Sequence, residues 1–266
     1  MSSIASRLLS MLRAGGFAAL VLLAGCVTGT DADAPQGSAA VKPDLAEAAR
    51  LNTQLGIDYA RQGQNDLALE KLKRAVEQDD RLPLAQSSIA FVYARLGESK
   101  LADRHYRRAI ELDPDDPSVR NNFGVFLCGN GRVAEGEAML RQAAENRRYR
   151  TPEAALTNAG VCARKLPDLA KAEQYFRDAL KLNPQFPDAL AQMAWLSYQK
   201  KDYLRSRAFL QRYQMVGPAT PETLQIGALT ETALGDAASA RAYQQRLQKE
   251  FPESVDSGKL PPVPAP

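Results

Sequence analysis

Small and large apolar side chains recur along the chain at intervals of 34 residues, which is the dominant feature of its hydrophobic pattern. Six units begin at Ala49, Pro83, Pro117, Glu153, Pro187 and Pro221, and the third is two residues longer, the extra residues falling before Thr151 and Pro152. The eighth position of every unit is small: Gly56, Ala90, Gly124, Gly160, Ala194 and Ala228. The twenty-fourth position of the first five units is large: Leu72, Tyr106, Leu140, Phe176 and Leu210. Small positions facing large ones indicate two closely packed helices in each unit.

Glycine and proline mark the ends of these predicted helices. Four units carry glycine at the fifteenth position, where a helix ends in the left-handed conformation: Gly63, Gly97, Gly131 and Gly235. The fourth unit has Pro167 and Asp168 there as helix breaker and N-cap. Proline opens the first helix of four units, where its missing N–H is not needed. Each unit is therefore predicted to be a helical hairpin.

The pattern resembles the tetratricopeptide repeat over residues 49–254. Two short helices cannot bury their apolar faces alone, so the hairpins are expected to stack around one shared core. The resemblance implies an all-α protein, a right-handed α-solenoid superhelix of six helical hairpins. In the last unit Gln244 takes the large position, and Glu231 and Gln245 are expected to form the polar outer face of a capping repeat.

The first 25 residues have the features of an export signal. Arg7 and Arg13 precede a short apolar run, Gly15 to Ala24, that is too short to span a bilayer. The run ends in Leu-Ala-Gly-Cys at Cys26, which resembles a bacterial lipobox and implies cleavage before Cys26 and acylation of that residue. The alternative is an uncleaved anchor in which Cys26 is an incidental thiol. By resemblance to known sorting rules, Val27 favours the outer membrane, and the protein is expected on its periplasmic face.

Two further segments outside the repeats are expected to be unstructured. Residues 26–48 carry the lipidated cysteine and a flexible tether, and residues 255–266 form a proline-rich tail. The composition of the whole chain, 45% hydrophobic and 24% charged, is that of an ordinary folded protein. The net charge of +3 includes the two arginines of the signal, and no basic stripe with interleaved aromatic residues suggests a nucleic-acid partner.

Two cysteines lie in neighbouring units. Cys128 and Cys162 fall late in the first helices of units three and four, and export places them in an oxidising compartment. Two interpretations remain, a disulfide or two buried thiols, and Gly124, Gly129 and Gly160 are expected to permit the close helix approach that a disulfide needs.

The sequence contains no pattern that favours catalysis. His105 is the single histidine, which excludes the common zinc-site spacings, and two thiols without a local histidine do not make a zinc site. No nucleophile-elbow, phosphate-loop or dinucleotide-loop motif is present. No enzymatic activity, cofactor, metal or small-molecule substrate is therefore expected.

The tetratricopeptide resemblance places the first helices on a concave groove, with positions two, five, nine and twelve facing inward. The predicted groove residues are the apolar Ile57, Leu84, Phe91 and Val125, the aromatic Trp195 and Tyr198, and Asn121. Aromatic anchors in a concave surface favour binding of another polypeptide. For Phe91 and Trp195 the alternative is packing between neighbouring helices. The lysine and asparagine set of carboxylate-clamp repeats is not matched, because Asn121 is the only asparagine at the fifth position.

Three segments extend the resemblance further. Residues 121–128 (NNFGVFLC), 152–162 (PEAALTNAGVC) and 172–180 (AEQYFRDAL) are similar to the PilW/PilF-like pilotins, lipoproteins of type IV pilus biogenesis and stability. Family membership implies an outer-membrane lipoprotein that binds the pilus secretin and helps it to localise or assemble, supporting twitching motility. The alternatives are an adaptor for outer-membrane protein assembly or control of peptidoglycan enzymes, and an enzyme with the array as accessory domain. The short length outside the repeats argues against the enzyme.

Overall fold

The computed structural model describes residues 44–166 and 169–256, and over these ranges it contains α-helices and no strands. The all-α prediction is therefore confirmed. The helices are α1 (Leu45–Arg61), α2 (Asn65–Gln78), α3 (Pro83–Arg95), α4 (Ser99–Leu112), α5 (Pro117–Gly129), α6 (Val133–Glu145), α7 (Pro152–Ala163), α8 (Leu169–Leu182), α9 (Pro187–Gln199), α10 (Tyr203–Gln214), α11 (Pro221–Ala233), α12 (Ala237–Glu250) and α13 (Pro252–Asp256). None of the helices in these ranges is long and apolar enough to cross a bilayer.

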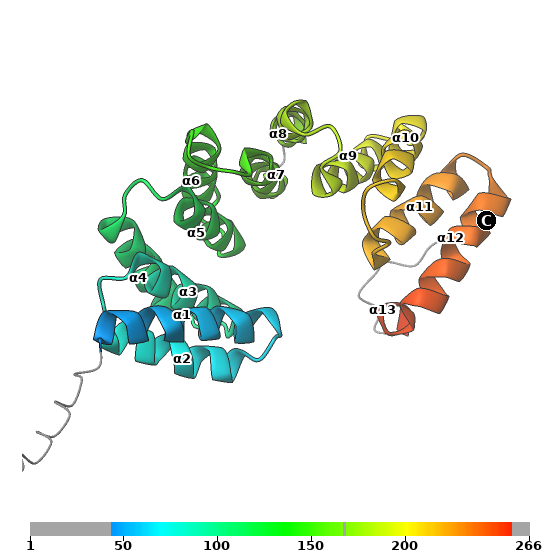
Figure 1. Ribbon diagram of the computed structural model, residues 1–266. Coiled ribbons are helices and arrows are strands. Elements are labelled where there is room, and N and C mark those ends of the chain that lie inside the picture. Colours follow the sequence, from blue (N-terminus) through cyan, green and yellow to red (C-terminus); the bar gives the residue numbers. More distant parts are fainter. Residues whose placement is uncertain (1–43, 167–168, 257–266) are drawn as a thin grey trace, which may run out of the picture. The chain divides into compact units, whose positions relative to one another are not determined.

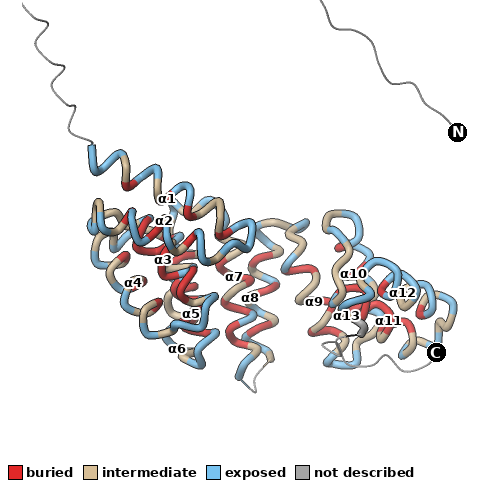
Figure 2. The backbone as a smooth tube through the Cα atoms, turned by 90° about the horizontal axis from the view of Figure 1, so that it is seen from below, coloured by how far each residue is buried: buried red, intermediate tan, exposed pale blue. Residues whose placement is uncertain are grey.

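Consecutive helices pair into the six predicted hairpins, α1 with α2 through to α11 with α12 (Figure 1). The first helix of each hairpin also contacts the first helix of the next, so α1, α3, α5, α7, α9 and α11 form one layer. Buried residues follow the faces along which these helices meet (Figure 2). The hairpins therefore share a continuous core, as expected for a stack of repeats.

In each hairpin, a small residue of the first helix packs against a large residue of the second helix. A Cβ atom added to Gly56 would lie 2.5 Å from Cγ of Leu72, and one added to Gly124 would lie 2.7 Å from Cγ of Leu140. The large residues predicted from the 34-residue period are fully or almost fully buried: Leu72, Tyr106, Leu140, Phe176 and Leu210. These pairs set how closely the two helices approach.

In the last repeat, the small and the large residue that contact each other both lie one position earlier than the repeat period predicts. Gly227 lies against the ring of Tyr243, at the same sequence separation as Gly56 and Leu72, whereas the period predicted Ala228 and Gln244 for these roles. Ala228 is nevertheless fully buried. The final hairpin thus uses an aromatic residue to fill the space that the predicted glutamine does not fill.

The turns within the hairpins have the predicted left-handed residue. The φ angles of Gly63, Gly97, Gly131 and Gly235 lie between 76° and 81°. Lys201 has φ 61° at the same position of the fifth repeat, which the sequence analysis missed because lysine is not a usual residue there. The cost of about 1 kcal/mol for a non-glycine residue is offset locally, since the N–H groups of Lys201 and Asp202 bond to carbonyls of α9. Pro167 and Asp168 lie outside the described residues.

The boundaries of the folded region differ from the prediction at both ends. Helix α1 begins at Leu45 rather than Ala49, because the carboxylate of Asp44 accepts hydrogen bonds from the N–H groups of Ala46 and Glu47 at 2.9 and 3.3 Å. The last part of the predicted tether is therefore helical. Helix α13 likewise extends past Ser254 to Asp256. The predicted signal, Cys26 and residues 257–266 lie outside the described residues.

Glu231 does not lie on a polar outer face, and this prediction is wrong. Its side chain is 4% exposed, and its carboxylate accepts hydrogen bonds from the guanidinium of Arg207 on α10 at 2.9 and 3.1 Å. The charge is tolerated because the arginine compensates it at short range. Glu231 therefore joins the last two repeats, while Gln245 remains exposed as predicted.

The structure brings Cys128 and Cys162 together, with their sulfur atoms paired and their Cα atoms 5.5 Å apart. The pair joins α5 to α7, which are first helices of adjacent repeats.

The room for Cys128 comes from Gly136 of α6, since a Cβ atom there would overlap the Cys128 sulfur. The three glycines predicted to make this room do not do so. Gly124 faces Leu140, Gly160 faces Phe176, and Gly129 has open space around its Cα atom.

Replacing Gly136 by alanine is expected to destabilise the array by about 2 kcal/mol, because the new Cβ would lie 2.7 Å from the Gly124 carbonyl oxygen and 2.9 Å from the Cys128 nitrogen. Both atoms belong to the α5 backbone and cannot move aside alone. Gly129→Ala is the matched control, since no atom lies within 4 Å of its added Cβ. Urea unfolding followed by circular dichroism measures both variants. Equal midpoints for the two would contradict the close-packing account.

Oxidation of Cys128 and Cys162 is a further prediction. A bond closing a sequence separation of 34 is expected to stabilise the protein by roughly 3 to 4 kcal/mol in the chain-entropy model. Peptide mapping of the exported protein without reduction should recover the two cysteines in one linked species. The double variant Cys128→Ser/Cys162→Ser should unfold at the same urea concentration as the reduced wild type. Recovery of both residues as separately alkylated peptides would show that the thiols are free.

Candidate functional site

An apolar residue of the first helix stands at the ninth position of every repeat. The row comprises Ile57, Phe91, Val125, Val161, Trp195 and Leu229. Phe91, Val125 and Val161 are 43%, 46% and 38% exposed, and the other members are half-buried. The predicted groove set contained four of these residues. Val161 and Leu229 complete the row, and the repeat period carries the signal that finds them. The layer of first helices therefore presents a hydrocarbon surface that the core does not use.

The first of two cavities on this layer, the N-terminal cavity, lies between α1, α3 and α5 and has a volume of about 390 Å³. It brings together three of the predicted groove residues, Ile57, Leu84 and Phe91. Leu84 is 52% exposed. Val125 and Asn121 do not line this cavity, where α5 contributes Val119 and Asn122 instead. Large exposed apolar side chains in a concave site are typical of a surface that binds a protein segment.

Polar residues occupy part of the rim of the N-terminal cavity. Arg95 donates a hydrogen bond from Nη1 to the carbonyl oxygen of Ala60 at 2.7 Å, and its guanidinium carbon lies 5.7 Å from the centroid of the Phe91 ring. Arg61 also lines the cavity, and its guanidinium lies 3.5 Å from the carboxylate of Asp58. Both arginines are thus engaged at the edge, which leaves the apolar centre of the cavity for a ligand.

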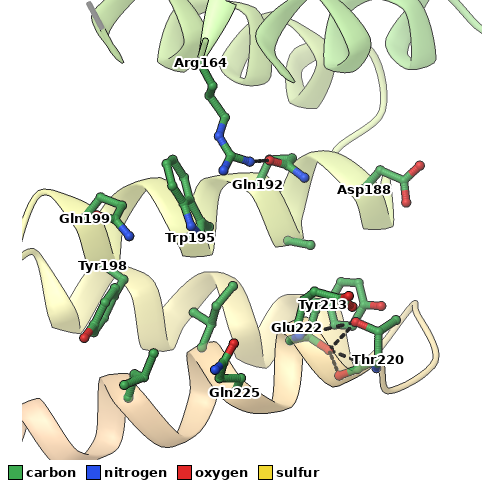
Figure 3. A pocket seen from close by; sticks show the side chains of 14 residues that line it. Arg164, Asp188, Gln192, Trp195, Tyr198, Gln199, Tyr213, Thr220, Glu222 and Gln225 are labelled. Atoms are coloured by element: carbon green, nitrogen blue, oxygen red, sulfur yellow. Dashed lines mark hydrogen bonds between the residues drawn. The ribbon is translucent and has the colours of Figure 1, made fainter. Parts of the chain in front are cut away.

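The C-terminal cavity, of about 480 Å³, lies between α7, α9 and α11 and contains the predicted Trp195 and Tyr198 (Figure 3). The two aromatic residues come from α9, with Gln225 facing them from α11. Asp188 and Glu222 stand at the second position of α9 and α11 and place carboxylates at the opposite end. This cavity is therefore more polar than the N-terminal one.

Trp195 has a packing role in the wall of the C-terminal cavity. The guanidinium carbon of Arg164 lies 3.3 Å from the centroid of its ring, and Arg164 also donates a hydrogen bond to Gln192. Trp195 also packs against two clusters of buried residues, one that contains Phe176 and one that contains Leu210. Burial lowers the pKa of the Arg164 guanidinium. One face of Trp195 is therefore covered, whereas Phe91 remains open to solvent.

The fifth position faces the groove in some repeats only, since Ser87 and Gln225 line the cavities whereas Thr53, Asn121 and Thr157 do not. Thr53 and Thr157 are 1% and 3% exposed, and their hydroxyl groups donate to carbonyls of their own helices, to Ala49 at 2.7 Å and to Glu153 at 2.8 Å. Asn121 at the same position is half-buried and accepts a hydrogen bond from Nδ2 of Asn158 at 2.9 Å. These residues lie where neighbouring first helices meet, so they stabilise the stack.

His105 lies in neither cavity. It is half-buried, its Nδ1 is 2.7 Å from Oε1 of Gln86, and its ring stacks on Tyr93 with a centroid distance of 5.5 Å. Burial lowers the pKa of His105, with a further contribution from the charge of Arg104. Among residues 44–166 and 169–256, no group of three or more histidine, cysteine or acidic side chains is arranged to hold a metal ion.

Comparison with known proteins assigns the family. Models of the tetratricopeptide repeat match residues 85–116, 105–138, 127–189 and 165–225. The type IV pilus assembly protein PilF of Pseudomonas aeruginosa is 29% identical over 90% of this chain and 94% of its own length. The solved structure of PilW, described as a widely conserved type IV pilus biogenesis factor, is 30% identical, covers 80% of this chain and 98% of its own, and has a TM-score of 0.69. The chain belongs to the PilF/PilW family of type IV pilus tetratricopeptide repeat proteins.

Other solved structures agree with this assignment. The structure of PilF from Pseudomonas aeruginosa is 28% identical, covers 81% of this chain and 97% of its own, and has a TM-score of 0.69. A tetratricopeptide repeat protein from Parabacteroides merdae has a TM-score of 0.61 at 16% identity, over 76% of this chain and 78% of its own, and shows a shared fold alone. The predicted family of PilW/PilF-like proteins is thus confirmed.

This PilF/PilW-family chain has a single tryptophan, so tryptophan fluorescence tests whether Arg164 covers the Trp195 ring. Replacing Arg164 by methionine removes the cation from the indole face. Acrylamide is expected to quench the fluorescence of this variant more strongly than that of the wild type, by about twofold. Arg95→Met serves as control, since Arg95 lies over Phe91 instead. Equal quenching of wild type and Arg164→Met would show that Arg164 does not cover the ring in solution.

Proposed function

We propose that this protein is a pilotin, a scaffold that binds a subunit of the type IV pilus secretin and promotes its localisation and multimerisation in the outer membrane. Membership of the PilF/PilW family supports a role in type IV pilus biogenesis. The groove chemistry supports capture of a polypeptide, because large hydrocarbon side chains such as Leu84 and Phe91 are exposed on it. The proposed role is one of binding and positioning, without catalysis.

The observation that carries this proposal is the N-terminal cavity. Ile57, Leu84 and Phe91 gather there from two helices, and the last two are 52% and 43% exposed. Their exposure is unfavourable in the isolated protein, and burial of apolar surface by a partner contributes roughly 25 cal/mol per Å² before the costs of association. A secretin segment with an apolar anchor would fill this cavity.

The proposal includes attachment to the outer membrane through lipid on Cys26, with the array on the periplasmic side. The predicted export signal and the lipobox-like sequence before Cys26 support it. Lipid at Cys26 would concentrate the groove at the membrane into which the secretin inserts. Binding sites held at one surface meet at a higher effective concentration than free molecules do, and this favours assembly of many secretin subunits there.

The function is tested in the parent bacterium by deleting the gene and restoring it as variants. Phe91→Glu places a charge in the N-terminal cavity and is expected to reduce secretin multimers in the outer-membrane fraction, and twitching motility, at least fivefold. Leu67→Glu is the matched control, since Leu67 is 42% exposed on α2 and lines neither cavity. Immunoblots of unboiled membrane fractions measure the multimers.

Two outcomes would reject this function. Normal outer-membrane multimers in the deletion strain would exclude a secretin role. If the multimers were normal while outer-membrane protein assembly or cell-wall remodelling failed, the protein would be an adaptor for that envelope task. Loss of function in Leu67→Glu equal to that in Phe91→Glu would place the binding surface outside the N-terminal cavity.

A further inference from the structure

A third cavity, which we call the basic cavity, is formed by α8, α9 and α10 and has a volume of about 450 Å³. These three helices follow one another in the array (Figure 1). Its apolar lining consists of Leu180, Met193 and Phe209. Its charged lining consists of Arg177, Lys181, Arg205 and Arg212. It shares no residue with either groove cavity, and none of its lining residues is acidic.

The floor of the basic cavity is hydrocarbon. Met193 is 2% exposed, and Leu180 and Phe209 are half-buried. The guanidinium carbon of Arg212 lies 5.5 Å from the centroid of the Phe209 ring, so the cation stands directly beside the apolar floor. A ligand that fits this site needs an apolar portion next to a negative charge.

Three of the four cations at its rim are weakly held, whereas the fourth, Arg177, donates a hydrogen bond to the carboxylate of Glu173 on its own helix at 3.0 Å. Lys181 pairs with Asp178 at 2.7 Å and Arg205 with Asp202 at 3.3 Å, and both pairs lie on single helices with the cation more than half exposed. Exposed pairs of this kind contribute about 0 to 1 kcal/mol each. Arg212 bonds to the carbonyl oxygen of Pro184 at 2.7 Å rather than to a carboxylate. An incoming anion can therefore bind these cations at a small cost in free energy from the contacts that they lose.

Two highly exposed apolar side chains stand on the same helix as the rim. Leu204, directly before Arg205, is 68% exposed, and Met215, three residues after Arg212, is 83% exposed. Leu204 and Met215 thus stand at the two ends of α10, which carries Arg205 and Arg212, and exposed apolar residues beside arginines are found where a helix lies in the interface of an anionic membrane. A soluble acidic peptide would neutralise the arginines but gives no reason for the exposure of Leu204 and Met215.

We propose that the basic cavity binds an anionic phospholipid of a membrane surface. The phosphate lies among Lys181, Arg205 and Arg212, the upper part of the acyl chains covers Leu180, Met193 and Phe209, and Leu204 and Met215 enter the surrounding lipid. Each positive side chain near an anionic surface is attracted by it, and the attraction adds over neighbouring charges. The basic cavity is separate from the groove, so it can bind lipid regardless of which protein is bound in the groove.

The test uses the full chain in a non-ionic detergent, titrated with dihexanoylphosphatidylglycerol and, separately, with the zwitterionic dihexanoylphosphatidylcholine. Native mass spectrometry measures the bound lipid. The anionic lipid is expected to bind at least tenfold more tightly. Arg205→Gln/Arg212→Gln should weaken its binding by about fivefold for each arginine removed. Arg104→Gln/Arg108→Gln is the matched control, because these arginines, the first exposed and the second half-buried, lie on the second helix of another repeat.

A further variant removes apolar contact without risk to folding, since Met215 is 83% exposed. Met215→Gln is expected to weaken binding of the protein to phosphatidylglycerol vesicles at least twofold in flotation. Equal binding of the two lipids, unchanged binding in the Arg205/Arg212 variant, or equal loss in the Arg104/Arg108 control would overturn the proposal. Binding of a short glutamate-leucine peptide without lipid binding would instead assign the cavity to an acidic protein segment. No secretin takes part, so these outcomes are independent of those for the proposed function.

Discussion

The packing of a small residue beneath a large one within each hairpin is the contact on which the rest of the array depends. Gly56 under Leu72 and Gly124 under Leu140 allow two helices to approach so closely that no Cβ atom fits between them. Interiors are packed too densely to absorb an extra atom at such places. Because the contact recurs with the repeat, it fixes the orientation of each helix pair and, through it, which positions remain for the surface.

The groove follows from that orientation. Because the small and large positions are buried in the core, the ninth position of each repeat is left on the open side of the layer. The apolar residues there, such as Phe91 and Val125, stay exposed although the fold does not require them. The array thus separates two tasks, with the hairpin contacts providing stability and the open layer of first helices providing a surface for another protein.

The two ends of that layer differ in chemistry. In the N-terminal cavity Leu84 and Phe91 are exposed, whereas in the C-terminal cavity Arg164 covers Trp195 and carboxylates stand at the far end. Between α8, α9 and α10, arginine and lysine surround an apolar floor. Surfaces that differ in charge and polarity in this way favour different ligands.

The sequence alone determined the features that repeat locally: the helical hairpins, their boundaries to within a few residues, the left-handed glycines and the gathering of Ile57, Leu84 and Phe91. These features depend on backbone preferences and on which face of a helix a residue occupies, and a 34-residue period records both. The tertiary structure decided the rest. It buried Glu231 against Arg207, gave Gly136 the place beside Cys128, covered Trp195 and formed the basic cavity. Each of these features is a contact between different helices. Its geometry depends on how neighbouring hairpins pack against one another. The position of a residue on its own helix does not specify that packing.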